Sequence, residues 1–233
     1  MALNALPTKV VAGVTIPDTP LLSEAFTFAR EHSTDYTYNH INRALLLGCI
    51  IADKVPATKE RDREAHAVAA VLHDLGFPIG HPPHSQVLSS DKRFEVDGAD
   101  AARDFLRRVG VEKEWDKHRL QLVWDAIALH TIGSIVFHKE PEVQATAYGI
   151  WADFQGPDRV PGGLLTWEEY NAVVKVGFAI SLRVSLITLS GCFQLSRYLA
   201  SHYVVGVSSL RPDERRQREH AASLQDKAGD DNR

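Results

Sequence analysis

Residues 67–76 read Ala-Val-Ala-Ala-Val-Leu-His-Asp-Leu-Gly. Six small or branched apolar side chains in succession predict a buried helix, and the glycine at the end of the stretch predicts where that helix stops. The apolar run closes on His73 and Asp74, whose imidazole and carboxylate are unfavourable to bury unless they are paired or bind a metal. The stretch therefore predicts a core helix that ends on a pair of metal ligands.

Two further residues extend this pair to the pattern H…HD…D. His40 lies upstream and Asp153 downstream, each in another helix-like stretch. Neighbours on a helix diverge by about 100°, but at its C-terminus His73 and Asp74 can converge on an ion that lies beyond the last turn. Two imidazoles and two carboxylates suit Zn(II), Fe(II) or Mn(II), and the absence of nearby thiolates argues against a structural zinc. For Asp153, an N-cap or surface position is the alternative.

The composition is that of an ordinary globular protein. The chain has 233 residues, of which 44% are hydrophobic and 24% charged, with a formal net charge of -4. This charge balance gives no reason to expect a nucleic-acid partner. Only Cys49 and Cys192 are present, and the first 20 residues lack the pattern of a signal peptide. We therefore expect no disulfide framework and a cytoplasmic location.

Apolar residues recur with the helical period along most of the chain. We therefore expect an all-α fold, one compact helical bundle around the metal site, with no strands. The expected helices cover residues 21–31, 40–53, 59–75, 96–109, 115–129 and 142–154, and a seventh begins at residue 167. Thr58 is the expected N-cap of the third helix and Gly76 the residue that ends it.

The domain layout follows from the same pattern. We expect an N-terminal extension at residues 1–20, the helical domain at 21–206 and a polar, disordered tail at 207–233. Residues 176–195 are largely apolar but contain Arg183. A charged residue inside an apolar stretch of this length favours a buried core helix over a membrane span.

Five short motifs follow one another in a specific order and spacing. They are Asn39-His40-Ile41-Asn42-Arg43, Leu72-His73-Asp74-Leu75-Gly76, Arg93-Phe94-Glu95 with Gly98-Ala99, Ile127-Ala128-Leu129-His130, and Asp153 followed by Gly156. Together they resemble the motifs of HD-domain metalloproteins and, within that superfamily, of the fungal cyanamide hydratases, over about residues 20–160. The resemblance implies an HD-domain helical bundle with a single zinc ion, ahead of Fe(II) or Mn(II), bound by His40, His73, Asp74 and Asp153.

Further residues are expected around this ion. Arg43 lies three positions after His40, on the same helix face, where it can orient a ligand carboxylate. The resemblance makes His130 a pocket residue that contacts substrate or water, with the hydroxyl of Thr131 beside it; a core histidine bonded to a backbone carbonyl is the alternative. Glu95 has two interpretations, a salt-bridge partner and a group that handles protons.

The residue after the second motif bears on the substrate. Most HD-domain proteins resemble phosphohydrolases, and many carry a lysine shortly after the HD pair, whereas this chain has Phe77 there. A phenyl ring supplies no charge for a phosphate and walls the pocket, which favours a small neutral molecule. Together with the resemblance, this leads us to expect a zinc-dependent cyanamide hydratase, a hydro-lyase: hydroxide generated at neutral pH attacks the nitrile carbon, and His130 or Glu95 donates the proton that leads to urea.

Other functions stay open at this point. A phosphohydrolase acting on a nucleotide or phosphomonoester would use the nearest cations, Arg43, Lys92 and Arg93. A regulator with a degenerate HD domain is disfavoured because all four ligand types are present. No membrane partner is expected, and a homo-oligomer is left open.

Two features depart from simple family patterns. A dinuclear site would need additional histidines, but Glu95 occupies the position where the dinuclear pattern has its next one. The candidates for such a second site are His81, His84, His118, His130 and His138. The C-terminal region has Gly191-Cys192-Phe193 but lacks the Lys-Pro-Trp and His-Thr elements that follow this segment in the hydratases.

Overall fold

The structure is a computed structural model that describes residues 6–78, 87–111 and 114–181. All of these belong to the first of two compact units, Met1–Leu186, and the second, Ile187–Arg233, lies outside the described residues. The helices are α1 (Pro20–Glu31), α2 (Asp35–Lys54), α3 (Arg63–Leu72), α4 (Phe94–Val109), α5 (Lys117–Leu129), α6 (Gly133–Val136), α7 (Pro141–Gln155) and α8 (Trp167–Ser181), with 3-10 turns at Pro157–Arg159 and Pro161–Gly163. The predicted all-α bundle is confirmed.

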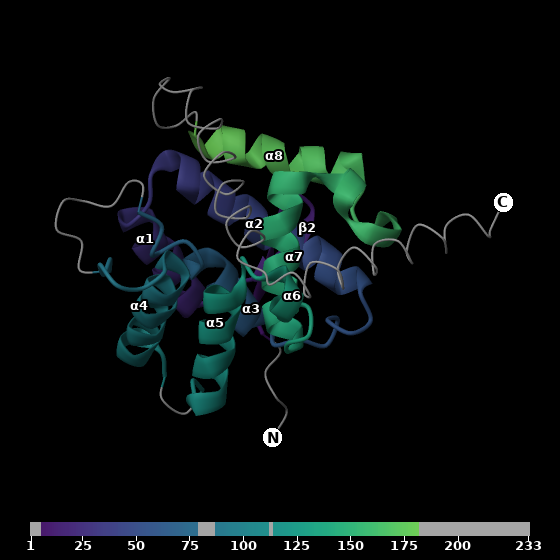
Figure 1. The fold of residues 1–233 in the computed structure, drawn as a ribbon. Coiled ribbons are helices and arrows are strands. Elements are labelled where there is room, and N and C mark those ends of the chain that lie inside the picture. Colours follow the sequence, from purple (N-terminus) through teal and green to yellow (C-terminus); the bar gives the residue numbers. More distant parts are fainter. Residues whose placement is uncertain (1–5, 79–86, 112–113, 182–233) are drawn as a thin grey trace, which may run out of the picture. The chain divides into compact units, whose positions relative to one another are not determined.

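α3 is the central helix. Every residue from Glu64 to Leu72 is buried, and the helix packs against α1, α2, α5 and α7 (Figure 1). It begins at Arg63, later than predicted, because the carboxylate of Asp62 accepts the N–H groups of Glu64 and Ala65 at 3.1 and 3.0 Å. The predicted N-cap, Thr58, is instead buried and donates its hydroxyl to the carbonyl of Ala52 at 3.0 Å.

α3 ends at Leu72, three residues before the predicted end. His73 follows as the C-cap, and Asp74 comes after it. α2 also differs from the prediction, since it begins at Asp35, where Thr34 accepts the N–H of Thr37 at 3.2 Å. His40 therefore lies inside α2, not at its start.

The prediction that the chain has no strands was wrong. Two short antiparallel strands, β1 (Thr8–Val11) and β2 (Val14–Pro17), form a hairpin through Ala12 and Gly13, both with positive φ. Val14 and Ile16 point into the core while Thr15 between them is exposed, an alternation too short to be distinguished from an irregular segment by its sequence. Part of the expected N-terminal extension thus packs against α2 and α3.

α2 and α7 approach each other more closely than helices with ordinary side chains could. A Cβ atom on Gly149 would lie 2.0 Å from the carbonyl oxygen of Ala44 and 2.7 Å from the backbone nitrogen of Gly48. Only glycine fits at this crossing. The crossing sets His40 of α2 against Asp153 of α7, whose side chains are in hydrogen-bond contact.

Among the described helices, none is both long enough and apolar enough to cross a membrane. The apolar stretch predicted at residues 176–195 lies outside the described residues from position 182 onward. The same holds for the expected domain boundary at residue 206, the polar tail and the divergent C-terminal elements.

Candidate metal centre

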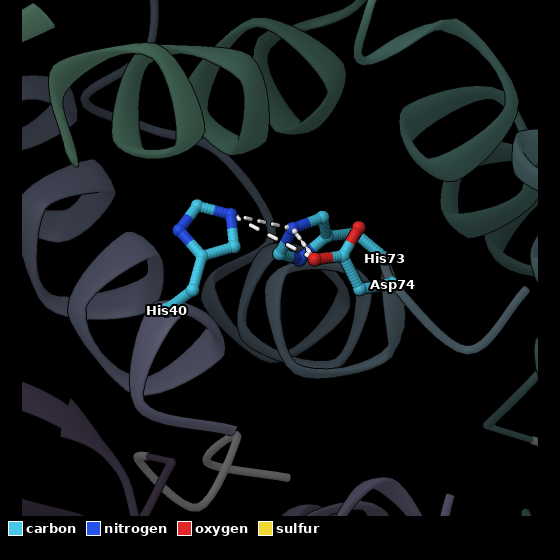
Figure 2. A group of neighbouring side chains, drawn as sticks. All are labelled: His40, His73 and Asp74. Carbon is cyan, nitrogen blue, oxygen red and sulfur yellow. Dashed lines mark hydrogen bonds and ion pairs between the residues drawn. The ribbon is translucent and has the colours of Figure 1, made fainter. Parts of the chain in front are cut away.

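Three side chains from two parts of the chain converge on one point (Figure 2). His40 reaches it from α2, and His73 and Asp74 reach it from the end of α3. The Nε2 atoms of the two histidines are 3.1 Å apart, and Oδ2 of Asp74 lies 3.4 Å from Nε2 of His73 and 3.9 Å from Nε2 of His40. The three side chains expose between 0 and 9% of their surface. The described residues contain no second group of this kind.

Hydrogen bonds on the far side of each ring fix the tautomers. Nδ1 of His73 donates to the carbonyl of Ala70 at 2.8 Å, and Nδ1 of His40 donates to Oδ2 of Asp153 at 2.7 Å. In the neutral rings both Nε2 atoms therefore carry lone pairs, and these lone pairs face each other. Two such nitrogens and a carboxylate oxygen repel one another unless a cation lies between them, so the residues fit a divalent metal ion.

The charges at the centre support the same conclusion. Burial acts to lower the pKa of His73, but the adjacent Asp74 carboxylate outweighs burial and raises it. Burial acts to raise the pKa of Asp74, but the charges of His73 and His40 hold it well below the usual range. The pair thus favours a proton on His73 and an ionised Asp74, and a metal ion would compete with that proton for the same atoms.

Asp153 lies on the other side of His40. Its Oδ1 accepts from Nε of Arg43 at 2.6 Å, and its Oδ2 accepts from Nη2 of Arg43 at 2.9 Å as well as from His40. Burial acts to raise the pKa of Asp153, but these hydrogen bonds outweigh it and lower it, so the carboxylate is ionised. The structure does not bring this expected fourth ligand into the group of three, and the carboxylate that Arg43 orients is that of Asp153.

His130 lies next to the ligands. Its ring meets that of His73 edge to face, with centroids 5.1 Å apart, and its Nδ1 donates to the carbonyl of Ile127 at 2.7 Å. It therefore makes the carbonyl bond of a core histidine and also contacts His73 of the candidate metal centre. Burial and the neighbouring His73 lower the pKa of His130 to about 4, which leaves Nε2 as an unprotonated acceptor at neutral pH.

Glu95 is held in an ion pair. Its carboxylate accepts from the hydroxyl of Thr131 at 2.6 Å and from Nε of Arg93 at 3.1 Å, with a further bond from Nη2 of Arg93. Burial acts to raise the pKa of Glu95, but Arg93 and Thr131 outweigh it and lower it. Glu95 is therefore ionised and placed to favour a positive charge on His130.

Aromatic rings wall the centre. Buried Phe77 meets Phe94 edge to face at 5.5 Å, and Phe94 meets His130 at 5.8 Å. A Cβ on Gly76 would lie 1.9 Å from the carbonyl oxygen of Phe94, so the glycine lets the start of α4 approach the HD pair. Phe154 covers His40 at a centroid distance of 4.5 Å and is 40% exposed.

Sequence reasoning missed the roles of Phe94 and Phe154. Each adjoins a predicted site residue, Glu95 and Asp153 respectively, and this adjacency was the available signal. Among the histidines considered for a second metal, His118 and His138 are not part of any metal-binding group in the described residues. His81 and His84 lie outside the described residues.

Comparison with known proteins gives one family. The family model of the HD domain matches residues 37–148, a segment that contains His40, His73 and Asp74 and ends before Asp153. No curated protein and no solved structure matches the chain. The match supports the HD-domain superfamily for this segment and leaves the substrate to be inferred from the site.

Proposed function

We propose that this protein, whose residues 37–148 match the HD-domain family model, is a metal-dependent enzyme that adds water to cyanamide and releases urea. The domain and its His/Asp site imply metal-dependent activity of the hydrolase type. The proposal rests above all on the donor set, two imidazole nitrogens and a carboxylate oxygen within 4.8 Å of one another. Cyanamide is the finer part of the proposal and is argued from the walls of the site.

Three ligands are the arrangement of a catalytic rather than a closed structural site. His40, His73 and Asp74 would hold the ion, for which we propose zinc ahead of Fe(II) or Mn(II). Bound there, the ion would supply a Lewis acid and lower the pKa of water toward neutrality. Asp153 supports the site by holding the His40 tautomer whose Nε2 faces the ion.

The protein's own groups can move the proton that the reaction requires. Addition of water across the nitrile transfers one hydrogen from water to the nitrile nitrogen, and the resulting isourea tautomerises to urea. Neutral His130 can accept that proton at Nε2 and return it to the nitrogen. The Glu95 carboxylate favours the transient charge on His130. We assign Glu95 this electrostatic role because its ion pair with Arg93 keeps it deprotonated.

The surroundings of the centre favour a small neutral substrate. Phe77, Phe94 and Phe154 supply apolar surface, and the ligands themselves are almost fully buried. Arg43, the cation nearest to the ligands in sequence, already binds Asp153 through two nitrogens. The Asp153 carboxylate therefore offsets the charge of Arg43, and a phosphate dianion gains less there than at an unpaired cation, whereas cyanamide needs only the ion and one proton acceptor.

One observation favours a second candidate, phosphohydrolysis. The side chain of Arg93 is 63% exposed beside Glu95, at the edge of the site, and a guanidinium in such a place can bind a phosphate. Arg93→Gln separates the candidates, because it removes the cation and leaves the ligands in place. If the protein is a phosphohydrolase, this variant should lose phosphate binding. If it is a hydratase, the variant should keep its KM for cyanamide.

The proposed function is tested by presenting zinc-loaded protein with cyanamide and, separately, with nucleoside monophosphates. Urea is measured by coupling to urease and ammonia detection, and phosphate is measured directly. Asp74→Asn, which removes one charge from the centre, is the matched inactive control. We expect urea and negligible phosphate from the unchanged protein. Phosphate release without urea would reject the hydratase and retain the metal site.

A further inference from the structure

A cavity of about 260 Å³ has none of the three candidate metal ligands in its lining. Its walls come from the hairpin, α1, α2 and α8. Six of the lining side chains are pure hydrocarbon, Val11, Ile16, Phe26, Leu45, Leu46 and Val173, and the ring of Tyr38 adds to them. The cavity is slightly smaller than the 300–1,000 Å³ typical of drug-sized ligands, so a molecule of about six to ten non-hydrogen atoms matches it.

The polar part of the lining consists of two cations and the neutral side chains of Tyr38 and Asn42. Lys9 and Arg43 line the cavity, and no acidic side chain among the described residues does. Lys9 pairs with Asp18 at 2.9 Å, but both side chains are more than 40% exposed, and an exposed pair of this kind contributes little and exchanges readily. Arg43 uses Nε and Nη2 to bind Asp153, while its Nη1 makes no hydrogen bond within the described part of the chain.

We propose that this cavity binds a small carboxylate with an unbranched apolar tail. The carboxylate accepts from Nη1 of Arg43 and is attracted by Lys9, while the tail lies against Leu45, Leu46 and Val173. Two lining cations without an acid explain the preference for an anionic head, and the aliphatic walls explain the preference for a tail. The binding step does not depend on the proposed reaction.

The cavity is also connected to the metal centre. Arg43 binds Asp153, and Asp153 binds His40, so a single chain of hydrogen bonds runs from the cavity to a metal ligand. An anion added on Arg43 makes the potential at the centre more negative, which favours a bound cation. By reciprocity, the zinc-loaded protein binds the carboxylate more tightly than the metal-free protein does, by at least about fivefold.

Calorimetric titration of the full chain with hexanoate tests the site, with 1-hexanol as the probe that lacks the charge. Val11→Trp fills the cavity, and Val10→Trp is the matched control, because Val10 is the exposed neighbour on the same strand and does not line the cavity. We expect saturable hexanoate binding with a Kd below about 1 mM in the unchanged protein and in Val10→Trp. Binding should be at least about tenfold weaker in Val11→Trp, and hexanol should bind at least about tenfold more weakly than hexanoate.

Circular dichroism establishes that both variants fold. Absence of saturation in the unchanged protein and in Val10→Trp would overturn the proposal, as would equal affinity in Val11→Trp. Equal binding of hexanol would reject the anionic head, and equal affinity of metal-free and zinc-loaded protein would reject the connection to His40. None of these outcomes depends on urea formation, so they are independent of the proposed reaction.

Discussion

The Nδ1 hydrogen of His40 is donated to Asp153 over 2.7 Å, and this bond determines which nitrogen of the ring faces the metal centre. Arg43 holds the same carboxylate from the other side. The orientation of the His40 ring in the candidate metal centre thus depends on a contact between α2 and α7.

Asp153→Asn should weaken zinc binding by about 10- to 100-fold. The amide keeps the shape of the side chain but loses the charge that the bonds from His40 and Arg43 require. Competition with a chromophoric chelator measures the affinity. Asp104→Asn, at an exposed position on α4, is the matched control and should bind zinc as the unchanged protein does. Unaltered affinity in Asp153→Asn would show that this carboxylate supports no part of the site.

His130→Ala should retain zinc and lose most of its rate. A positioned acid or base contributes about 10²- to 10⁴-fold, so kcat should fall by that amount while metal content stays near that of the unchanged protein. Steady-state kinetics with cyanamide and metal analysis of the same samples measure both quantities. His118→Ala replaces an exposed histidine and serves as the control. Kinetics equal to those of the unchanged protein would leave His130 with a purely structural role.

Gly149→Ala should destabilise the fold by about 1–3 kcal/mol or more, as overpacked core positions do. The new Cβ would lie 2.0 Å from the carbonyl oxygen of Ala44, and α2 and α7 would have to separate. Urea-induced unfolding followed by circular dichroism measures the free energy of unfolding. Because the same separation pulls Asp153 away from His40, the zinc affinity of the folded variant should fall as well. A variant of unchanged stability would contradict the close helix crossing.

Stability should fall between pH 6.5 and pH 5 because of His66. This fully buried ring accepts from Nε of Arg61 at 3.0 Å, and burial together with the charges of Arg61 and Arg63 lowers its pKa well below the ordinary value. In the unfolded chain the pKa of this imidazole is ~6.5, so as the pH falls the unfolded chain binds a proton that the folded protein does not bind. The contribution of neutral His66 to the free energy of unfolding is therefore complete above pH ~6.5, and it is lost as the pH falls toward the pKa of His66 in the folded protein.

The free energy of unfolding at pH 7.5 and pH 5 measures this effect. His66→Gln keeps an acceptor for Arg61 but does not titrate, so its stability should change less over the same interval. His130, whose pKa is lowered to about 4, contributes with the same sign in both proteins and so does not affect the comparison. An identical pH dependence in the variant would assign the loss to other groups.

The sequence predicted the helical class and the chemistry of the HD pair because both depend on local pattern. Six consecutive apolar residues before His73 and Asp74 are enough to show that the pair ends a core helix. The position of Asp153 relative to His40 depends on the rotation and crossing of α2 and α7, which no local pattern records. The sequence could predict that the carboxylate of Asp153 lies near the site, but it could not predict that this carboxylate binds Nδ1 of His40.

Other differences have similar causes. The hairpin alternates over too few residues to be recognised, and only the packing of Val14 and Ile16 against the helices identifies it. The start of α3 was misplaced because Thr58 and Asp62 are both acceptable N-caps by residue type. The structure selects Asp62, which satisfies two backbone N–H groups.

The most direct test of the central claim is the rate of urea formation from cyanamide as metal-free protein is titrated with zinc. One ion at His40, His73 and Asp74 predicts a rate that rises in proportion to zinc and stops rising at one equivalent per chain. His73→Ala should stay inactive throughout the same titration. A break at two equivalents would contradict a mononuclear site, and no urea at any level of zinc would contradict the proposed reaction.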